Sequence, residues 1–548
     1  MRGLMMDRPL LISGLIDYAA DVHQKSRVVS NRVEGDIHRY TYPEARARIA
    51  QLAHGLRALG VGPGDRVATI AWNGYRHFEL YYALAGIGAI CHTINPRLFP
   101  DQIAWIVNHA EDRLLFVDLT FLPLAEALAD KLPTVEHVLA MTDRAHLPET
   151  PLAELMAYED LLDGQPDYIV WPEFDENTAA GLCYTSGTTG NPKGVLYSHR
   201  SSVLHALSLA SLDALNLTQR DRILPVVPLF HVNAWGLPYA CPLTGTDLVF
   251  PGPGLDGASL FDLMDGEGVT SAWGVPTIWL GLLGELEKRG RTPKDLEMIL
   301  TGGSAAARSL IEALEGTHGL RVVHGWGMTE MSPVGTVCLM RPDMDDRSDA
   351  ERFDVKMRQG RRQSGCEMKI VDEAGAPLPH DGEAHGELLV RGNYIAGAYD
   401  NDAAASAAAL DDGGWFRTGD VATIDADGYM MVVDRTKDMI KSGGEWISSI
   451  DLENAAIGHP GLALAAVIGL PHPKWDERPL LVAVRREGAE VSDDDIRQFL
   501  ADKVASWWLP DAVEFVDALP MTATGKVKKA ALREQYKDYV LPTIDAAE

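Results

Sequence analysis

Apolar runs and helical periods alternate along the first part of the chain. Residues 43–60 place apolar side chains three or four positions apart, which predicts an amphipathic helix that ends at Gly60 or Gly62. The pattern that follows predicts strands at 66–72, 89–94 and 114–118 and helices at 77–87 and 100–110. Strands separated by helices are typical of an α/β fold with a parallel sheet.

The alternation resumes after residue 200 and later changes character. Helices are expected at 200–213, 275–289 and 304–315, and strands at 222–227, 298–301 and 321–324. From 366 to 434 the pattern favours a β-barrel-like subdomain, because Gly and Asp turns separate short strands. Those strands are expected at 366–371, 386–391, 421–424 and 429–433. The tail after Arg435 has an α+β pattern, so the fold class expected for the whole chain is α/β plus α+β.

The segment from Tyr184 to Val195, Tyr-Thr-Ser-Gly-Thr-Thr-Gly-Asn-Pro-Lys-Gly-Val, is dense in hydroxyls and glycines. Glycines let a backbone approach a ligand closely, and the hydroxyls, the N–H groups and Lys193 can surround phosphate oxygens. A Walker loop has Ser or Thr after its lysine and opens a helix, whereas Lys193 is followed by Gly194 and a strand-like run. The segment is therefore expected to join two strands, either as a phosphate-binding loop or as a solvated hairpin.

Acidic residues outnumber basic ones, with 78 Asp and Glu against 49 Lys and Arg, for a formal charge of −29. Nucleic acids and anionic membranes both bind proteins with an excess of Lys and Arg, so neither is expected as a partner. An anionic ligand such as ATP then has to be held by local basic residues against the overall field.

The five cysteines are scattered and show no CxxC spacing, so neither a zinc site nor a disulfide framework is expected. Buried, reduced thiols are the interpretation, and they are typical of a cytoplasmic protein. The first residues lack the long apolar core of a secretory signal. No window of about 18 uninterrupted apolar residues predicts a transmembrane helix.

Four further segments carry polar or charged side chains that suit a nucleotide. They are 324–330 (His-Gly-Trp-Gly-Met-Thr-Glu), 415–420, 434–445 and 520–527. The first follows an expected buried strand, which is where ligands usually bind in open α/β sheets. Each segment alone has an ordinary explanation as a turn, a helix start or a charged surface. Their occurrence together and in this order makes coincidence a poor explanation.

Together these segments resemble the adenylate-forming enzyme superfamily, which includes acyl-CoA synthetases, nonribosomal peptide adenylation domains and beetle luciferases. The resemblance covers nearly the whole chain. In general relatedness, although in no single motif, the chain is most similar to medium-chain acyl-CoA synthetases and to ligases for 3-methylmercaptopropionate. The resemblance implies a large N-terminal domain of two α/β subdomains and a β-barrel (1–434), a hinge (435–437) with Lys437 at the hinge position, and a small mobile C-terminal domain (438–548).

The resemblance also implies a reaction that uses ATP, Mg²⁺ and CoA. A carboxylate attacks the α-phosphate of ATP to give an acyl-adenylate and pyrophosphate, and a thiol then displaces AMP. Thr185 and Glu330 would bind Mg²⁺, and Trp326 stands where the family usually has tyrosine. The nucleotide would be bound by Thr185, Ser186, Gly187, Thr188, Thr189, Lys193, Gly302, Gly303, Ser304, His324, Gly325, Trp326, Gly327, Met328, Thr329, Asp420 and Arg435.

Lys526 matches the family's adenylation lysine, which would reduce the repulsion between the acyl carboxylate and the α-phosphate and align the attack. Rotation at the hinge would remove Lys526 and bring another segment of the small domain towards the thiol. That segment contains Lys441, Gly443, Gly444, Glu445 and Trp446. The catalytic residues implied are Lys526, Thr185, Glu330, His231 and Lys441.

His231, Trp235, Gly303 and Pro333 are expected to shape the acyl pocket. Amino-acid adenylation domains have an aspartate at the position of His231, so its absence favours a simple carboxylic acid. The bulk of Trp235 favours a short or medium chain, while a packed loop histidine is the ordinary alternative for His231. Four other tryptophans are expected in the core: Trp72, Trp105, Trp273 and Trp279.

The leading hypothesis is an AMP-forming carboxylic acid–CoA ligase, expected to be a homodimer. The motifs separate it poorly from an adenylating enzyme that loads the phosphopantetheine of a carrier protein, because both acceptors present the same thiol arm. A non-catalytic nucleotide-binding relative is a third hypothesis. The retained Lys193, Glu330, Asp420, Arg435 and Lys526 argue against it.

Overall fold

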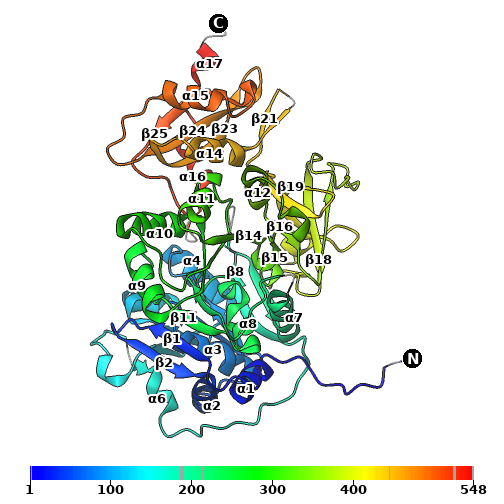
Figure 1. The fold of residues 1–548 in the computed structure, drawn as a ribbon. Coiled ribbons are helices and arrows are strands. Elements are labelled where there is room, and N and C mark those ends of the chain that lie inside the picture. The colour runs from blue at the N-terminus through cyan, green and yellow to red at the C-terminus, as the bar shows by residue number, and fades with distance from the viewer. Residues whose placement is uncertain are drawn as a thin grey trace.

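The computed structural model describes residues 1, 3–152, 154–185, 191–212, 214–443, 445–522 and 526–545, and three sheets organise this part of the chain (Figure 1). The predicted Ser186, Gly187, Thr188, Thr189 and Gly444 lie outside the described residues. No described helix is long and apolar enough to cross a membrane.

The first sheet has seven strands, and all of its neighbours are parallel except the last pair, β8 and β9. Across the sheet the strands are β7 (Met156–Ala157), β6 (His137–Ala140), β5 (Leu114–Val117), β3 (Arg66–Ile70), β4 (Ile90–Thr93), β8 (Ala179–Tyr184) and β9 (Gly194–Ser198). The Tyr184–Val195 segment therefore joins two antiparallel strands, as its sequence predicts.

The second sheet has thirteen strands: from β1 to β14 its neighbours are parallel, while the edge pair β1–β2 and the pairs from β14–β15 onwards are antiparallel. Its first part is β2 (Ile37–Thr41), β1 (Arg27–Asn31), β11 (Asp247–Phe250), β10 (Arg222–Pro225), β12 (Ser271–Gly274), β13 (Met298–Thr301) and β14 (Arg321–Gly327). Its antiparallel part is β15 (Val334–Val337), β16 (Gly360–Arg362), β20 (Tyr429–Arg435), β19 (Phe416–Ile424), β18 (Gly386–Gly392) and β17 (Cys366–Val371). This antiparallel part is the β-rich subdomain that the turn pattern predicts.

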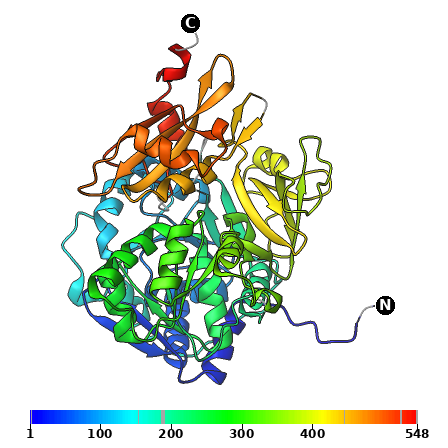
Figure 2. The same ribbon diagram turned by 45° about the horizontal axis from the view of Figure 1, so that its top comes forward.

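The third sheet belongs to the C-terminal part of the chain, drawn in orange and red above the larger body (Figures 1 and 2). Its strands are β22 (Glu445–Ile447), β21 (Ile440–Ser442), β24 (Asp476–Arg485) and β23 (Leu462–His472), with β25 (Ala512–Phe515) parallel to β24. Two apolar clusters around this sheet consist of residues 440 and beyond, so it has a core of its own.

Helices surround these sheets. They are α1 (Ser13–Val22), α2 (Tyr42–Ala58), α3 (Tyr75–Gly86), α4 (Pro100–Ala110), α5 (Leu122–Leu128), α6 (Tyr158–Leu162), α7 (His199–Ala210), α8 (Leu237–Thr244), α9 (Gly257–Glu267), α10 (Pro276–Arg289), α11 (Arg308–Glu312), α12 (Asp349–Lys356), α13 (Ala403–Ala409), α14 (Ser449–Ile457), α15 (Asp493–Ala501), α16 (Lys529–Gln535) and α17 (Pro542–Asp545). α2 begins with a capping box, in which Thr41 and Glu44 satisfy each other's backbone N–H groups.

α3 lies between the two α/β units and contacts both, and all 12 of its residues are buried. On one side, Nε2 of His77 lies 2.9 Å from the hydroxyl of Thr69 on β3. On the other, the hydroxyl of Tyr82 donates a 2.6 Å hydrogen bond to the carbonyl of Pro238 on α8. The charged residues of this buried helix are paired, Arg76 with Glu34 and Glu159 and Glu79 with Arg48, which is how a protein interior accommodates charge.

The predicted fold class is confirmed, and two helix boundaries were wrong. The helix expected at 304–315 begins at Arg308, because the chain first turns at Gly303 (φ +80°) and buries Ala306 before the helix starts. The helix expected at 200–213 ends at Ala210, where Ser211 takes an extended conformation. The five cysteines are buried and free, as expected.

Candidate active site

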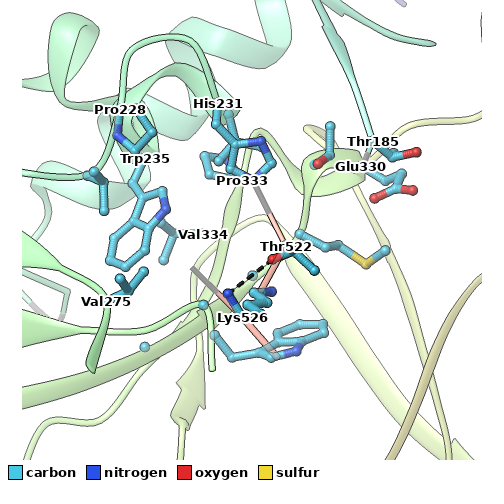
Figure 3. A pocket seen from close by; sticks show the side chains of 18 of the residues that line it. Thr185, Pro228, His231, Trp235, Val275, Glu330, Pro333, Val334, Thr522 and Lys526 are labelled. Carbon is cyan, nitrogen blue, oxygen red and sulfur yellow. Dashed lines mark hydrogen bonds between the residues drawn. The ribbon is translucent and has the colours of Figure 1, made fainter. Parts of the chain in front are cut away.

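A cleft of about 540 Å³ opens where several strands of both large sheets end. Thr185 follows β8, Val226 follows β10, Val275 follows β12 and Gly303 follows β13, and all four line the cleft. Parallel strands bring their carboxyl ends to one edge, which is where α/β sheets usually bind ligands. Figure 3 shows Thr185 and Glu330 on one side of this cleft and Trp235 and Val275 on the other, with Lys526 between them.

The cleft is locally basic in a strongly acidic protein. Of the described residues that line it, six are Arg or Lys and two are Asp or Glu. The basic residues are Arg97, Lys193, Arg417, Arg435, Lys437 and Lys526. The acidic residues are Glu330 and Asp438. This is the local reversal of charge that a polyanionic ligand requires in a chain of formal charge −29.

Thr185 and Lys193 lie together at the base of the loop between β8 and β9. The N–H of Thr185 donates to the carbonyl of Lys193 at 2.9 Å, and the N–H of Lys193 donates to the hydroxyl of Thr185 at 3.2 Å. The ammonium of Lys193 lies 4.8 Å from the ring centre of Tyr399. Backbone pairing therefore fixes the two side chains at the mouth of the loop.

Glu330 lies on a 3-10 turn, Thr329–Met331, that follows β14, and it is 5% exposed. The hydroxyl of Tyr399 donates a 2.6 Å hydrogen bond to Oε1 of Glu330, and the hydroxyl of Tyr197 donates to the carbonyl of Thr329 at 2.7 Å. Burial raises the pKa of Glu330 above its ordinary value. The turn presents this one carboxylate to the cleft.

Trp326, Asp420 and Arg435 form a connected group. Asp420 and Arg435 are paired across β19 and β20, and Nε of Arg435 lies 2.7 Å from Oδ1 of Asp420. The indole N–H of Trp326 donates to Oδ2 of Asp420 at 2.9 Å. Trp326, which stands where the family usually has tyrosine, therefore offers an indole N–H as a hydrogen-bond donor at this wall.

Lys526 reaches the cleft from the C-terminal part of the chain. Its backbone N–H donates to the hydroxyl of Thr522 at 3.0 Å, which fixes the base of the lysine (Figure 3). Burial lowers the pKa of Lys526 to about 8, Arg435 acts in the same direction, and Asp420 opposes the change. A Cβ atom added at Gly303 would lie 3.9 Å from Cε of this lysine.

The apolar side of the cleft contains the predicted His231, Trp235 and Pro333 (Figure 3). Trp235 covers the glycines after β13, since a Cβ atom at Gly302 would lie 3.1 Å from Cη2 of its indole. Burial lowers the pKa of His231 to about 4, with a smaller effect of Lys526, so the imidazole is neutral near pH 7. A neutral imidazole beside apolar walls can accommodate an uncharged chain.

Several predicted residues lie outside the lining of the cleft. Lys441, Gly443, Glu445 and Trp446 are exposed on the β21–β22 hairpin. His324 is buried beneath the site at 2% exposure. The remaining predicted residues outside the lining are Gly302, Ser304 and Asp420.

The sequence missed other lining residues. Trp72 was expected in the core, but it is only partly buried and lines the cleft next to Asn73. The signal was present, because Trp72 ends an expected strand and strand ends form the site. Tyr399, which holds Glu330, was not singled out, and nothing in its local pattern marks it.

Comparison with known proteins agrees with this arrangement. The model of the AMP-binding enzyme family matches residues 16–400, and the AMP-binding enzyme C-terminal domain matches residues 451–526. The chain is 50% identical to the 3-methylmercaptopropionyl-CoA ligase of Ruegeria lacuscaerulensis, over 98% of this chain and 99% of that protein. It is 48% identical to the medium-chain-fatty-acid–CoA ligase of Ectopseudomonas oleovorans, over 99% and 98% of the two chains.

A solved structure has the same fold. The anthranilate CoA ligase AuaEII in complex with anthranoyl-AMP superposes with a TM-score of 0.86 at 26% identity, over 99% of both chains. A large N-terminal region with α/β sheets and a smaller C-terminal region define the adenylate-forming fold. The chain belongs to the AMP-binding enzyme family.

Proposed function

We propose that the protein is an AMP-forming carboxylic acid–CoA ligase that acts on short- or medium-chain acids. The observation that carries the proposal is one cleft whose charged lining is mostly basic, with Thr185 and Glu330 on one side, apolar residues around Trp235 on the other and Lys526 between them. An excess of basic residues in the lining suits a triphosphate, and an apolar side suits the chain of an acid. The relatives named CoA ligases support the same class, which is acid–thiol ligase.

The reaction has two balanced steps. In the first, a carboxylate oxygen of the acid forms a bond to the α-phosphorus of ATP, and the bond to pyrophosphate breaks. In the second, the sulfur of CoA forms a bond to the acyl carbon, AMP leaves with the bridging oxygen, and the thiol proton goes to solvent. Adenylation is needed because the oxygen of a free carboxylate is a very poor leaving group.

Lys526 would act in the first step. Its ammonium would lie between two anions, the acyl carboxylate and the α-phosphate, and would reduce their repulsion while holding them in line. Thr185 and Lys193, with Ser186, Gly187, Thr188 and Thr189, would bind the outer phosphates. Thr329 would contact the α-phosphate.

The adenosine of ATP would lie against the group formed by Trp326, Asp420 and Arg435. Asp420 and Arg435 would hold the ribose hydroxyls, since the carboxylate keeps lone pairs free beyond those used by its two partners. The indole of Trp326 would stack on adenine. Gly302, Gly303, Ser304, Gly325, Gly327 and Met328 would complete the adenine slot, and His324 would support it from below.

Mg²⁺ fits the residues present. No group of three His, Cys, Asp or Glu side chains that could hold a metal occurs among the described residues. Mg²⁺ bound to a nucleotide needs only one or two protein ligands, because phosphates and water supply the others. Glu330 and the hydroxyl of Thr185 would hold it, and when bound it neutralises charge on the phosphates.

The second step would need a different pose of the small domain. We propose residues 1–434 as the N-terminal domain, 435–437 as the hinge with Lys437 at its pivot, and 438–548 as the mobile domain. The separate cores around the third sheet support this division. Rotation would withdraw Lys526 and bring Lys441, Gly443, Gly444, Glu445 and Trp446, now exposed, towards the thiol of CoA.

The acid itself is proposed from the apolar wall and the relatives together. Trp235, His231 and Pro333 leave room for a chain without a second charge near its carboxylate. Straight-chain fatty acids and 3-methylmercaptopropionate meet this condition, and the two relatives are named for such acids. A cytoplasmic homodimer is proposed with it.

The test is a panel of acids with ATP and Mg²⁺, with or without free CoA. We expect pyrophosphate release that depends on the acid, and acyl-CoA when CoA is present, with 3-methylmercaptopropionate and straight-chain acids turned over best. Acyl transfer to a holo-carrier protein but not to CoA would support the carrier-loading alternative. No acid-dependent pyrophosphate release across the panel would support a non-catalytic relative.

A further inference from the structure

His205 lies on α7 between the two walls of the acyl side of the cleft. It is 1% exposed and does not line the cleft itself. One wall carries Trp235, and the wall beside it carries Pro333 and Val334 (Figure 3). The two walls come from segments that are far apart in the sequence, so the distance between them in the fold depends on the residues packed between them.

On the first side, the imidazole of His205 lies against Gly236, the residue after Trp235. A Cβ atom at Gly236 would lie 2.7 Å from both Cε1 and Nδ1 of His205, and Gly236 has φ +85°. The preceding residues Val232 to Trp235 have φ between +44° and +56°, a run of left-handed backbone that L-residues rarely adopt. The turn that presents Trp235 therefore rests directly on the ring of His205.

On the second side, the imidazole holds the other wall by a hydrogen bond. The backbone N–H of Val334 donates to Nε2 of His205 at 3.0 Å. An N–H group can only donate, so Nε2 must be an unprotonated acceptor and the imidazole must be neutral. Burial favours this state, because it lowers the pKa of His205 to about 3.

We propose that His205 is a positioning residue for acid selection: it spaces the Trp235 wall from the Pro333–Val334 wall and so sets which acyl chains fit. The inference rests on the proposed function, because it concerns the acid that the cleft takes. His205 would influence acid selection without lining the cleft, because it acts through the backbone of Gly236 and Val334.

Two substitutions separate the contacts of His205. His205→Phe keeps a ring against Gly236 but removes the acceptor for Val334, whereas His205→Gln keeps an acceptor. Pyrophosphate release is measured for straight-chain acids of increasing length. We expect His205→Phe to change the ratio of kcat/KM between the best acid and its next longer homologue about tenfold, the size of effect that one misplaced methylene produces. We expect His205→Gln to stay within about threefold of the wild-type ratio.

His199→Phe is the matched control. His199 is on the same helix, is fully buried, and accepts a hydrogen bond from the backbone N–H of Ile12 at 3.2 Å, and neither residue lines the cleft. His199→Phe therefore makes the same substitution at another buried histidine that accepts a backbone hydrogen bond. We expect its ranking of acids to match the wild type, and the KM for ATP to stay within about threefold in all three variants.

The outcomes discriminate between the two claims. An unchanged ranking in His205→Phe, or the same change in His199→Phe, would overturn the positioning role while leaving the ligase proposal intact. A wild-type protein without acid-dependent pyrophosphate release would overturn both. If His205→Phe is recovered unfolded, His205→Asn takes its place, because its side chain is too short to put an acceptor at the Nε2 position.

Discussion

At the scale of single residues, the site is defined by side chains whose environment changes their chemistry. Glu330 and Lys526 have pKa values shifted by burial towards their neutral forms. Such shifts concentrate where a protein handles charge on a ligand. An anionic substrate reverses the effect on the lysine, since ATP beside Lys526 favours the ammonium.

The shift of Lys526 predicts a pH dependence. Its ammonium is the useful form and its pKa is lowered to about 8 in the free protein, so kcat/KM for adenylation should fall as pH rises through about 8. Lys526→Arg should keep some activity and lose this fall, because a guanidinium stays charged in that range. Pyrophosphate release measured from about pH 6 to about pH 10 tests both predictions. If the activity of Lys526→Arg falls at the same pH as that of the wild type, the fall is due to the titration of another group.

Lys526→Ala should separate the two half-reactions. The proposed mechanism puts the lysine between the acid and phosphate sites, so its loss should abolish adenylation, by about 100-fold or more. Thioester formation from supplied acyl-adenylate and CoA should persist, since the proposal gives the lysine a role in the first step alone. Equal loss of both half-reactions would contradict the assignment.

The indole of Trp326 gives a further test at this scale. Trp326→Phe keeps an aromatic face for adenine but removes the hydrogen bond to Asp420. A hydrogen bond to a charged group is worth about 1.5–3 kcal/mol, or about 10- to 150-fold, so we expect the KM for ATP to rise by at least about tenfold. The KM for the acid should be unaffected. Trp326→Tyr, which restores a donor at the same wall, is the conservative comparison.

At the scale of elements, the sequence predicts most strands and helices but not the local geometry that makes the site. β13 has the bounds predicted for it, 298–301, because an apolar run between polar turns has little alternative in a buried sheet. The helix after it was predicted four residues too early, because helix propensity says nothing of the turn at Gly303. The left-handed run before Gly236 carries no sequence signal except its glycine.

The same distinction holds for the functional residues. Lys193, Glu330 and Lys526 can be found from sequence because each lies in a recognisable segment, and the cleft lining includes all three. His205 and Tyr399 cannot, because their importance comes from tertiary contacts with segments far along the chain. Trp235 could be assigned to the acyl side, but what holds it could not.

The left-handed turn predicts a stability effect. Gly236→Ala adds a Cβ at φ +85° and 2.7 Å from His205, so it should destabilise the protein by about 2 kcal/mol. Gly284, exposed within α10 with nothing within 4 Å of an added Cβ, is the control. Gly284→Ala should stabilise by about 0.5–1 kcal/mol, because alanine loses less backbone entropy in a helix. Denaturant unfolding of both variants measures the contrast.

At the scale of the whole molecule, the position of Lys526 indicates which half-reaction this arrangement serves. The small domain lies against the larger body and places Lys526 in the cleft, while Lys441 and Trp446 stay exposed on their hairpin. The arrangement suits adenylation. If the small domain alternates between two poses as proposed, the thioester step requires it to move, and a block at the hinge should affect the two steps unequally.

Lys437→Pro tests that asymmetry. Proline fixes φ near −65° and would restrict rotation at the proposed pivot. Because the pose with Lys526 in place already exists, we expect adenylation within about threefold of Lys437→Ala, the control that removes the same charge without the ring. Thioester formation from supplied acyl-adenylate should fall about tenfold or more, since the hairpin cannot approach the thiol. This pattern is the reverse of Lys526→Ala. If both half-reactions are unaffected by the proline, the movement does not occur at residue 437, and the proposed hinge is wrong.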